Sequence, residues 1–113
     1  MLEIQTKRLE PDIVVLEIAG RLTLGRECKQ LEWATDNLIR EQQKKVIFDL
    51  SGVTRIDSTG IGILVMSAGQ MKKAGGQLRL AGATGHIQQV LLVSGVNKLV
   101  PLHSTAAAAA ADF

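Results

Sequence analysis

Polar and apolar residues alternate at the start of the chain, and this alternation predicts a pair of strands. Residues 2–8, LEIQTKR, follow the period of two that is typical of a half-exposed strand. Residues 13–18, IVVLEI, form a second, more apolar strand that ends at Gly20. The turn residues Pro11 and Asp12 lie between the two segments. We therefore expect these strands to be antiparallel neighbours.

Two long helices are predicted on either side of a short apolar strand. The first covers about residues 26–40, where apolar and small side chains recur with the helical period of about 3.6 residues. The strand is VIFDL, residues 46–50, whose nearly continuous apolar run suits a position covered on both faces. The second helix runs from about Ser58 to Ala74 and stops at the following glycine pair. The expected core stripe of the first helix comprises Cys28, Leu31, Ala34, Thr35, Leu38 and Ile39.

The last third of the chain combines short strands with short helices. QLRLA, residues 77–81, is predicted to be a strand, and LVPL near residues 99–102 is a candidate edge strand. Thr84 is a candidate N-cap for a short helix between them. Ser104 is a candidate N-cap for a last helix through the alanine run at 106–111, because alanine has the highest helix propensity.

The order of these elements, β-β-α-β-α-β-α-β-α, predicts an α/β fold. Helices that connect strands act as crossovers, so we expect a mixed, mostly parallel sheet of four to five strands with about four helices. A length of 113 residues suits a single domain that spans residues 1–113.

Composition and charge argue against several classes of protein. Lys and Arg number 13 and Asp and Glu 11, and aromatic residues make up only 3%, which does not fit a nucleic-acid binder. The single cysteine, Cys28, leaves no intrachain disulfide, and His86 and His103 lack the spacing of a zinc site, so we expect no metal and no cofactor. No apolar run reaches the about 18 residues of a membrane span, and the N-terminus does not resemble a signal peptide. These features predict a cytoplasmic protein.

A small polar cluster, Asp57-Ser58-Thr59-Gly60, separates the buried strand from the second long helix. In sheets of this type, the turn from a strand's carboxyl end into a helix is the usual functional edge. Asp57 or Ser58 can cap the helix by accepting a backbone N–H, and capping alone would explain small polar residues there. Ser58 also lies where the helix's partial positive charge is strongest. A phosphate of about −1.5 to −2 charges would be accommodated there without disturbing the fold.

One face of this helix carries apolar residues outside the expected core stripe. That stripe comprises Ile61, Leu64, Val65, Ala68 and Met71. Ile63 and Met66 lie on the opposite side of the helical wheel, which indicates a contact surface beside Ser58 unless another element covers them. Gly60 and Gly62 lower the helix propensity of the first turn. Their missing side chains would admit either a partner's backbone or tight packing against the sheet.

The motifs of common enzymes are missing. RIDSTG around Ser58 lacks the Gly-x-Ser-x-Gly elbow of serine hydrolases. STGIGILV resembles the start of a dinucleotide-binding loop but has Val65 where the third glycine belongs. No Gly-x-x-x-x-Gly-Lys-Ser/Thr phosphate loop occurs either. We therefore expect no catalytic residue and no enzymatic activity.

The sequence resembles the STAS domains of bacterial anti-sigma factor antagonists. VIFDLSGVTRIDSTGIGILV carries the resemblance together with LEIAGRLTL upstream, and the similarity spans nearly the whole chain. The combination of Asp-Leu-Ser at the strand end with Asp-Ser-Thr-Gly at the helix start is fairly specific at this spacing. The resemblance implies the STAS fold.

The resemblance also implies a phosphorylation switch at Ser58, the serine that follows the aspartate in the motif. In the family, the kinase of that serine is an anti-sigma factor with a histidine-kinase-like ATP-binding fold. The unphosphorylated antagonist sequesters this anti-sigma factor and frees a sigma factor. Phosphorylation breaks the complex, and a metal-dependent serine phosphatase restores it. The corresponding partner-binding residues here would be Asp57, Thr59, Gly60, Ile63 and Met66.

Position 23 departs from the pattern, because many relatives carry Asp where this chain has Thr23. The loop around it helps form the partner surface in the family, so the departure bears on which partner binds and how strongly.

Other functions remain open: a STAS scaffold subunit of a larger signalling assembly, an accessory subunit of a lipid transporter, or a small-molecule or nucleotide binder. The sequence leaves the oligomeric state open. Trp33 is expected to be partly exposed, as it lies opposite the first helix's core stripe.

Overall fold

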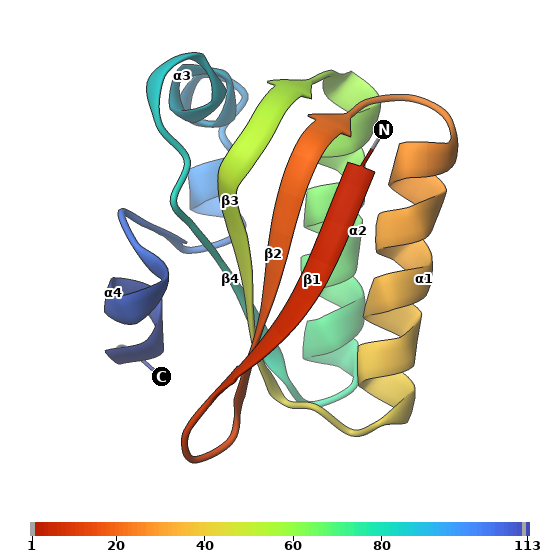
Figure 1. Ribbon diagram of the computed structural model, residues 1–113, viewed down its shortest axis with the longest axis vertical. Helices are drawn as coiled ribbons and strands as arrows, with labels where there is room; N and C mark the ends of the chain where they lie inside the picture. The colour runs from red at the N-terminus through yellow and green to blue at the C-terminus, as the bar shows by residue number, and fades with distance from the viewer. Residues whose placement is uncertain (1, 112) are drawn as a thin grey trace.

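The computed structural model describes residues 2–111 and 113, and its strands form one five-stranded mixed sheet (Figure 1). The spatial order is β1-β2-β3-β4-β5, so each strand lies beside its neighbour in sequence. β1 and β2 are antiparallel, whereas the other three pairs are parallel. The strands are β1 (Leu2–Leu9), β2 (Ile13–Leu22), β3 (Lys45–Ile56), β4 (Gln77–Ala81) and β5 (Leu102–His103).

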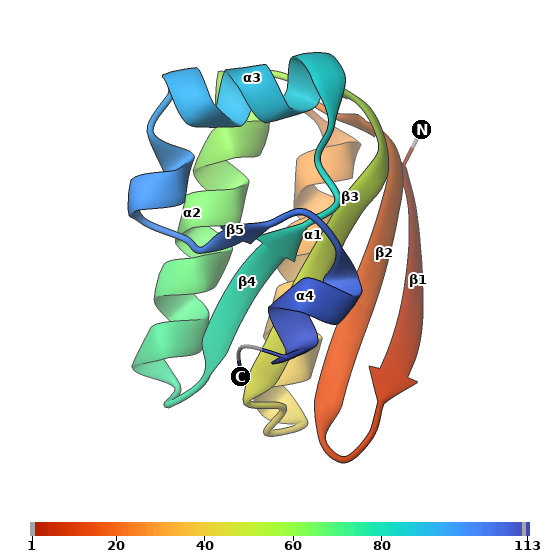
Figure 2. The ribbon, with the colours of Figure 1, turned by 90° about the vertical axis from the view of Figure 1, so that its left-hand side faces the viewer.

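Helices cover both faces of the sheet (Figures 1 and 2). α1 (Arg26–Arg40) and α2 (Ser58–Lys73) lie side by side on one face, and α4 (Ala106–Ala111) lies on the other. α3 (Gly85–Val93) crosses the end of the molecule at which β3 stops, and a 3-10 turn, η1 (Val96–Lys98), follows it. The carboxyl ends of β2 and β3 and the start of α2 therefore gather at one end of the molecule.

β3 is buried on both faces over the VIFDL run, as that run predicted. Val46, Phe48 and Leu50 belong to the main core with residues of α1 and α2, whereas Ile47 belongs to a smaller cluster on the face that α4 covers. Ala109 is fully buried in that cluster, because short alanine side chains let α4 lie close to the sheet. The buried members of the smaller cluster are Ile13, Val15, Ile47, Ala81 and Ala109.

The elements follow the sequence prediction, but several of their ends differ and η1 was not predicted. β2 and β3 both continue beyond the predicted apolar runs, to Leu22 and Ile56. The last strand is only Leu102–His103. Ser104 was the wrong cap for α4, because the backbone N–H of Ala108 donates to the Thr105 hydroxyl at 3.0 Å. Trp33 is 62% exposed, which confirms the prediction from the helical wheel.

Candidate functional site

Ser58 is the first residue of α2 and is exposed at the carboxyl end of β3. β3 runs through the core and ends at Ile56, so a single residue, Asp57, separates the buried strand from the helix. This short junction places the Ser58 side chain at the positive end of the α2 dipole and in contact with solvent. The predicted helix start is thus confirmed.

Asp57 is the N-cap of α2 and also holds a second loop. Its Oδ1 accepts a hydrogen bond from the backbone N–H of Gly60 at 2.8 Å, which satisfies one of the free donors of the first helical turn. Its Oδ2 accepts from the backbone N–H of Leu24 at 2.9 Å. One carboxylate therefore ties the loop after β2 to the start of α2.

The Asp57 carboxylate stays ionised to a lower pH than an ordinary aspartate. Hydrogen bonds from the backbone N–H groups of Leu24 and then Gly60 stabilise the charged form, and they lower the pKa of Asp57 from its usual 3.8. Both oxygens are engaged by backbone donors, so this group serves as a structural anchor. A role for Asp57 as the base that deprotonates Ser58 does not fit this arrangement.

The two glycines of the first turn have different surroundings. Gly60 is buried, and a Cβ there would clash with the backbone carbonyl of Leu22 and lie 2.9 Å from Cγ1 of Ile56. Gly62 is exposed, and a Cβ there would have no neighbour within 4 Å. Tight packing against the end of β2 therefore accounts for Gly60, and only Gly62 leaves backbone open to a partner.

The predicted exposed pair of Ile63 and Met66 is only half right. Met66 is 40% exposed, as expected. Ile63 is 8% exposed and belongs to the main core, together with Ile87 and Leu91 of α3. The prediction treated only one face of the helix as packed, whereas the buried residues of α2 cover a wider arc of the helical wheel. The Ile63 side chain is therefore not part of an exposed contact surface.

The remaining predicted residues lie around the same end of the molecule. Thr59 and Thr23 are half-buried. The Thr23 carbonyl accepts a hydrogen bond from the thiol of Cys28 at 3.2 Å, so this loop is also fixed from α1. Burial raises the pKa of the Cys28 thiol above its ordinary 9.0, and the negative charge of Asp57 contributes. The thiol is buried, as the core stripe predicted.

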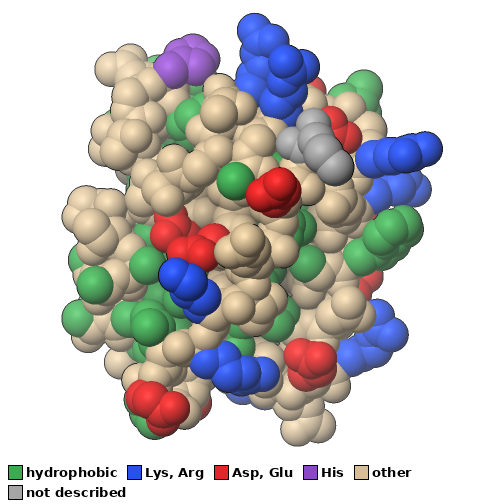
Figure 3. Space-filling view, in the orientation of Figure 1, with side chains coloured by type: hydrophobic (Ala, Val, Ile, Leu, Met, Phe, Trp, Pro, Cys, Tyr) green, Lys and Arg blue, Asp and Glu red, His purple; other side chains and the backbone are tan. Residues whose placement is uncertain are grey.

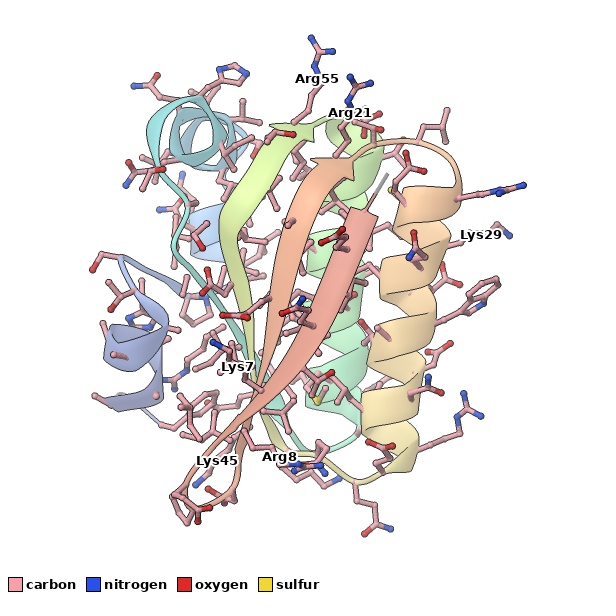
Figure 4. The ribbon with its side chains drawn as sticks, in the orientation of Figure 1. Lys7, Arg8, Arg21, Lys29, Lys45 and Arg55 are labelled. Atoms are coloured by element: carbon pink, nitrogen blue, oxygen red, sulfur yellow. The ribbon has the colours of Figure 1, made fainter. Side chains whose placement is uncertain are left out.

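The sequence did not predict that Arg21 and Arg55 lie side by side. They are partners across the β2–β3 ladder, next to the junction that carries Ser58. Blue side chains gather above the ends of these strands in Figure 3, and Figure 4 shows both arginines pointing out of the molecule there. Two register irregularities in the ladder create this pairing, and a search for charge runs along the sequence could not reveal it.

Other features of the described residues add no second site. No group of three or more His, Cys, Asp or Glu side chains in the described part of the chain could hold a metal ion. Among the same residues, no helix is both long and apolar enough to cross a bilayer. The hydroxyl-bearing residues Ser51 and Thr54 are also exposed, but they lie within β3 and not at a helix start.

The chain belongs to the STAS domain family: the family described as "Mlab, STAS domain" matches residues 6–101. A protein from Bordetella bronchiseptica named "Putative anti-sigma factor antagonist BtrV" is 28% identical over 85 residues, which are 75% of this chain and 73% of that protein. Among solved structures, an anti-sigma factor antagonist from Mycobacterium paratuberculosis has a TM-score of 0.87 at 20% identity, over 99% of this chain and 93% of the other. The Bacillus protein SpoIIAA in its phosphorylated form has a TM-score of 0.72 at 17% identity, over 97% and 98% of the two chains. These comparisons confirm the predicted α/β STAS fold.

Proposed function

We propose that this chain is an anti-sigma factor antagonist that binds its partner through the Ser58 end of the molecule and is switched by phosphorylation of Ser58. The observation that carries the proposal is the exposed Ser58 at the first position of α2, next to a cap that fixes the surrounding backbone. The names of the relatives support the antagonist role, and SpoIIAA is known in a phosphorylated form.

In this proposal the chain supplies a substrate hydroxyl and a docking surface. The partner kinase holds ATP and the general base. The Ser58 Oγ attacks the γ-phosphoryl group, an O–P bond forms, the hydroxyl proton passes to the kinase base, and ADP leaves. Asp57 holds the acceptor backbone in place throughout. A metal-dependent serine phosphatase would return the hydroxyl.

The switch follows from where the charge appears. The phosphate adds about −1.5 to −2 charges at a helix N-terminus, where it stabilises the helix by about 0.3–1 kcal/mol. Against a docked partner, a like charge costs several kcal/mol. Because each 1.4 kcal/mol is tenfold in affinity, we expect phosphorylation to weaken the complex by about a hundredfold or more.

The direct test is incubation with the cognate anti-sigma kinase and ATP, followed by mapping of the phosphorylated residue by mass spectrometry. Modification is expected at Ser58 and absent from Ser58→Ala. In binding assays Ser58→Ala should retain the affinity and Ser58→Asp should lose it. Ser104→Asp, which adds the same charge at an exposed position after β5, is the matched control and should bind as the unmodified chain does. Equal affinities for Ser58→Ala and Ser58→Asp would contradict the charge mechanism.

A further inference from the structure

Arg21 and Arg55 lie opposite one another only because β2 and β3 slip in register. Glu17 of β2 faces Asp49 of β3, and an unbroken ladder would place Arg21 against Val53. Irregularities between Glu17 and Ala19 and again between Gly20 and Arg21 advance β3 by two residues. Bulges of this kind commonly re-aim side chains near functional sites.

The arginine pair has no counter-charge in the described structure. Neither guanidinium takes part in the hydrogen bonds or ion pairs found among the described side chains, where the ion pairs are Lys7–Glu17 and Lys45–Asp12. Both residues are exposed, and neighbouring strands are only about 4.8 Å apart. Like charges directly opposite each other in a sheet destabilise it. A bound anion would remove this repulsion.

A phosphate on Ser58 would in turn need positive charge nearby. Asp57 is its neighbour in sequence, and backbone N–H groups keep that carboxylate ionised. A phosphate on Ser58 would therefore stand next to an existing negative charge. The helix N-terminus compensates only part of this repulsion, whereas two guanidinium groups supply two full positive charges and donors shaped for phosphate oxygens.

We propose that Arg21 and Arg55 form a clamp that binds the phosphate group of phosphorylated Ser58. Arg55 precedes Ser58 by three residues at the end of β3, and the β2–β3 ladder holds Arg21 beside Arg55. The clamp rests on the proposed function for its biological use. Beyond the proposed function, the clamp implies that phosphorylation withdraws two arginines from the surface offered to a partner. The positive charge of this end of the molecule therefore changes with the switch.

The test uses a chain in which phosphoserine is incorporated at position 58 during synthesis, so it needs no kinase and no partner. The second pKa of the phosphate is measured by phosphorus NMR titration. An unperturbed phosphoserine has a value of about 6. The intact clamp should hold the pKa below that value, and Arg21→Gln/Arg55→Gln should raise it again, by about one unit, a tenfold change in proton affinity.

A matched control removes two positive charges from the other end of the molecule. Arg8→Gln/Lys45→Gln is suitable, because both side chains lie at the opposite end in Figure 4. This variant should titrate as the unmodified phosphoprotein does, and amide NMR spectra should confirm that all variants are folded. The same phosphate pKa with and without the arginines would overturn the clamp, as would an equal shift in the control pair.

The clamp and the proposed function can fail separately. If no anti-sigma kinase modifies Ser58, the proposed switch fails, while the titration of the synthetic phosphoprotein still reports on the arginines. If the kinase modifies Ser58 but the titration is insensitive to Arg21 and Arg55, the switch stands and the clamp is wrong.

Discussion

The carboxylate of Asp57 accepts a hydrogen bond from the backbone N–H of Leu24, at 2.9 Å, across 33 residues of sequence. The second oxygen of the same group accepts from Gly60 and so starts α2. The loop that carries Thr23 and the helix that carries Ser58 are therefore held by one side chain. Any surface that a partner recognises across both segments depends on this link.

The first prediction concerns the loss of that link. Asp57→Ala removes an N-cap and leaves two backbone donors without their partner, so it should lower the free energy of unfolding by about 1–2 kcal/mol. Asp57→Asn keeps a neutral acceptor at the same place and should lose less. Urea unfolding followed by circular dichroism measures both. An Asp57→Ala protein as stable as the parent would show that the cap contributes nothing.

The second prediction is the pH dependence of this contribution. The pKa of Asp57 is lowered in the folded chain, so the folded state binds a proton less readily than the unfolded state does. The stabilisation is therefore fully present above the ordinary value of 3.8 and disappears as the pH falls through that value towards the folded pKa. The difference in unfolding free energy between the parent and Asp57→Asn should be constant near neutral pH and shrink below about pH 4. A difference that grows on acidification would have the wrong sign.

The third prediction uses two glycines in one helical turn. Gly60→Ala forces a methyl group against the Leu22 carbonyl and should destabilise the chain by about 1–3 kcal/mol. Gly62→Ala enters open space within the same helix and should stabilise by about 0.5–1 kcal/mol, because alanine has the higher helix propensity. Thermal unfolding of the two single variants tests the contrast. Similar shifts in both would mean that close packing does not explain Gly60.

Local signals in the sequence predicted much of this molecule. The sequence left the helix cap open between Asp57 and Ser58, and the structure uses Asp57. The helix start at Ser58 and the buried strand VIFDL depend on a few neighbouring residues, and the structure has both. Ile63 was misjudged because its burial depends on how α2 packs within the folded core, where residues distant in the sequence cover it. Helical periodicity identifies one face of a helix but does not reveal how many elements pack around it.

The parts of the site that the sequence did not predict arise from long-range register. The Leu24–Asp57 hydrogen bond and the Arg21–Arg55 pair each join residues more than 30 positions apart. The arginines would not meet without the irregularities in the β2–β3 ladder, and such irregularities have no clear signature in this sequence. Ser58 and its charged neighbour Asp57 can therefore be found from the sequence, whereas the Arg21–Arg55 pair cannot.

The last prediction concerns a buried polar contact between α1 and α2 that supports the helix carrying Ser58. The Thr35 hydroxyl lies 2.9 Å from the Leu31 carbonyl and 3.1 Å from the Ser67 hydroxyl, and Thr35 and Ser67 are each 1% exposed. Thr35→Val leaves the Ser67 hydroxyl without this partner in the core and should cost about 1–3 kcal/mol, and Ser67→Ala should also destabilise. Removing both hydroxyls leaves fewer unsatisfied polar atoms, so the double variant should lose at least about 0.5 kcal/mol less than the sum of the single changes. Strict additivity in this double-mutant cycle, measured by urea unfolding, would mean that the two hydroxyls do not interact in solution.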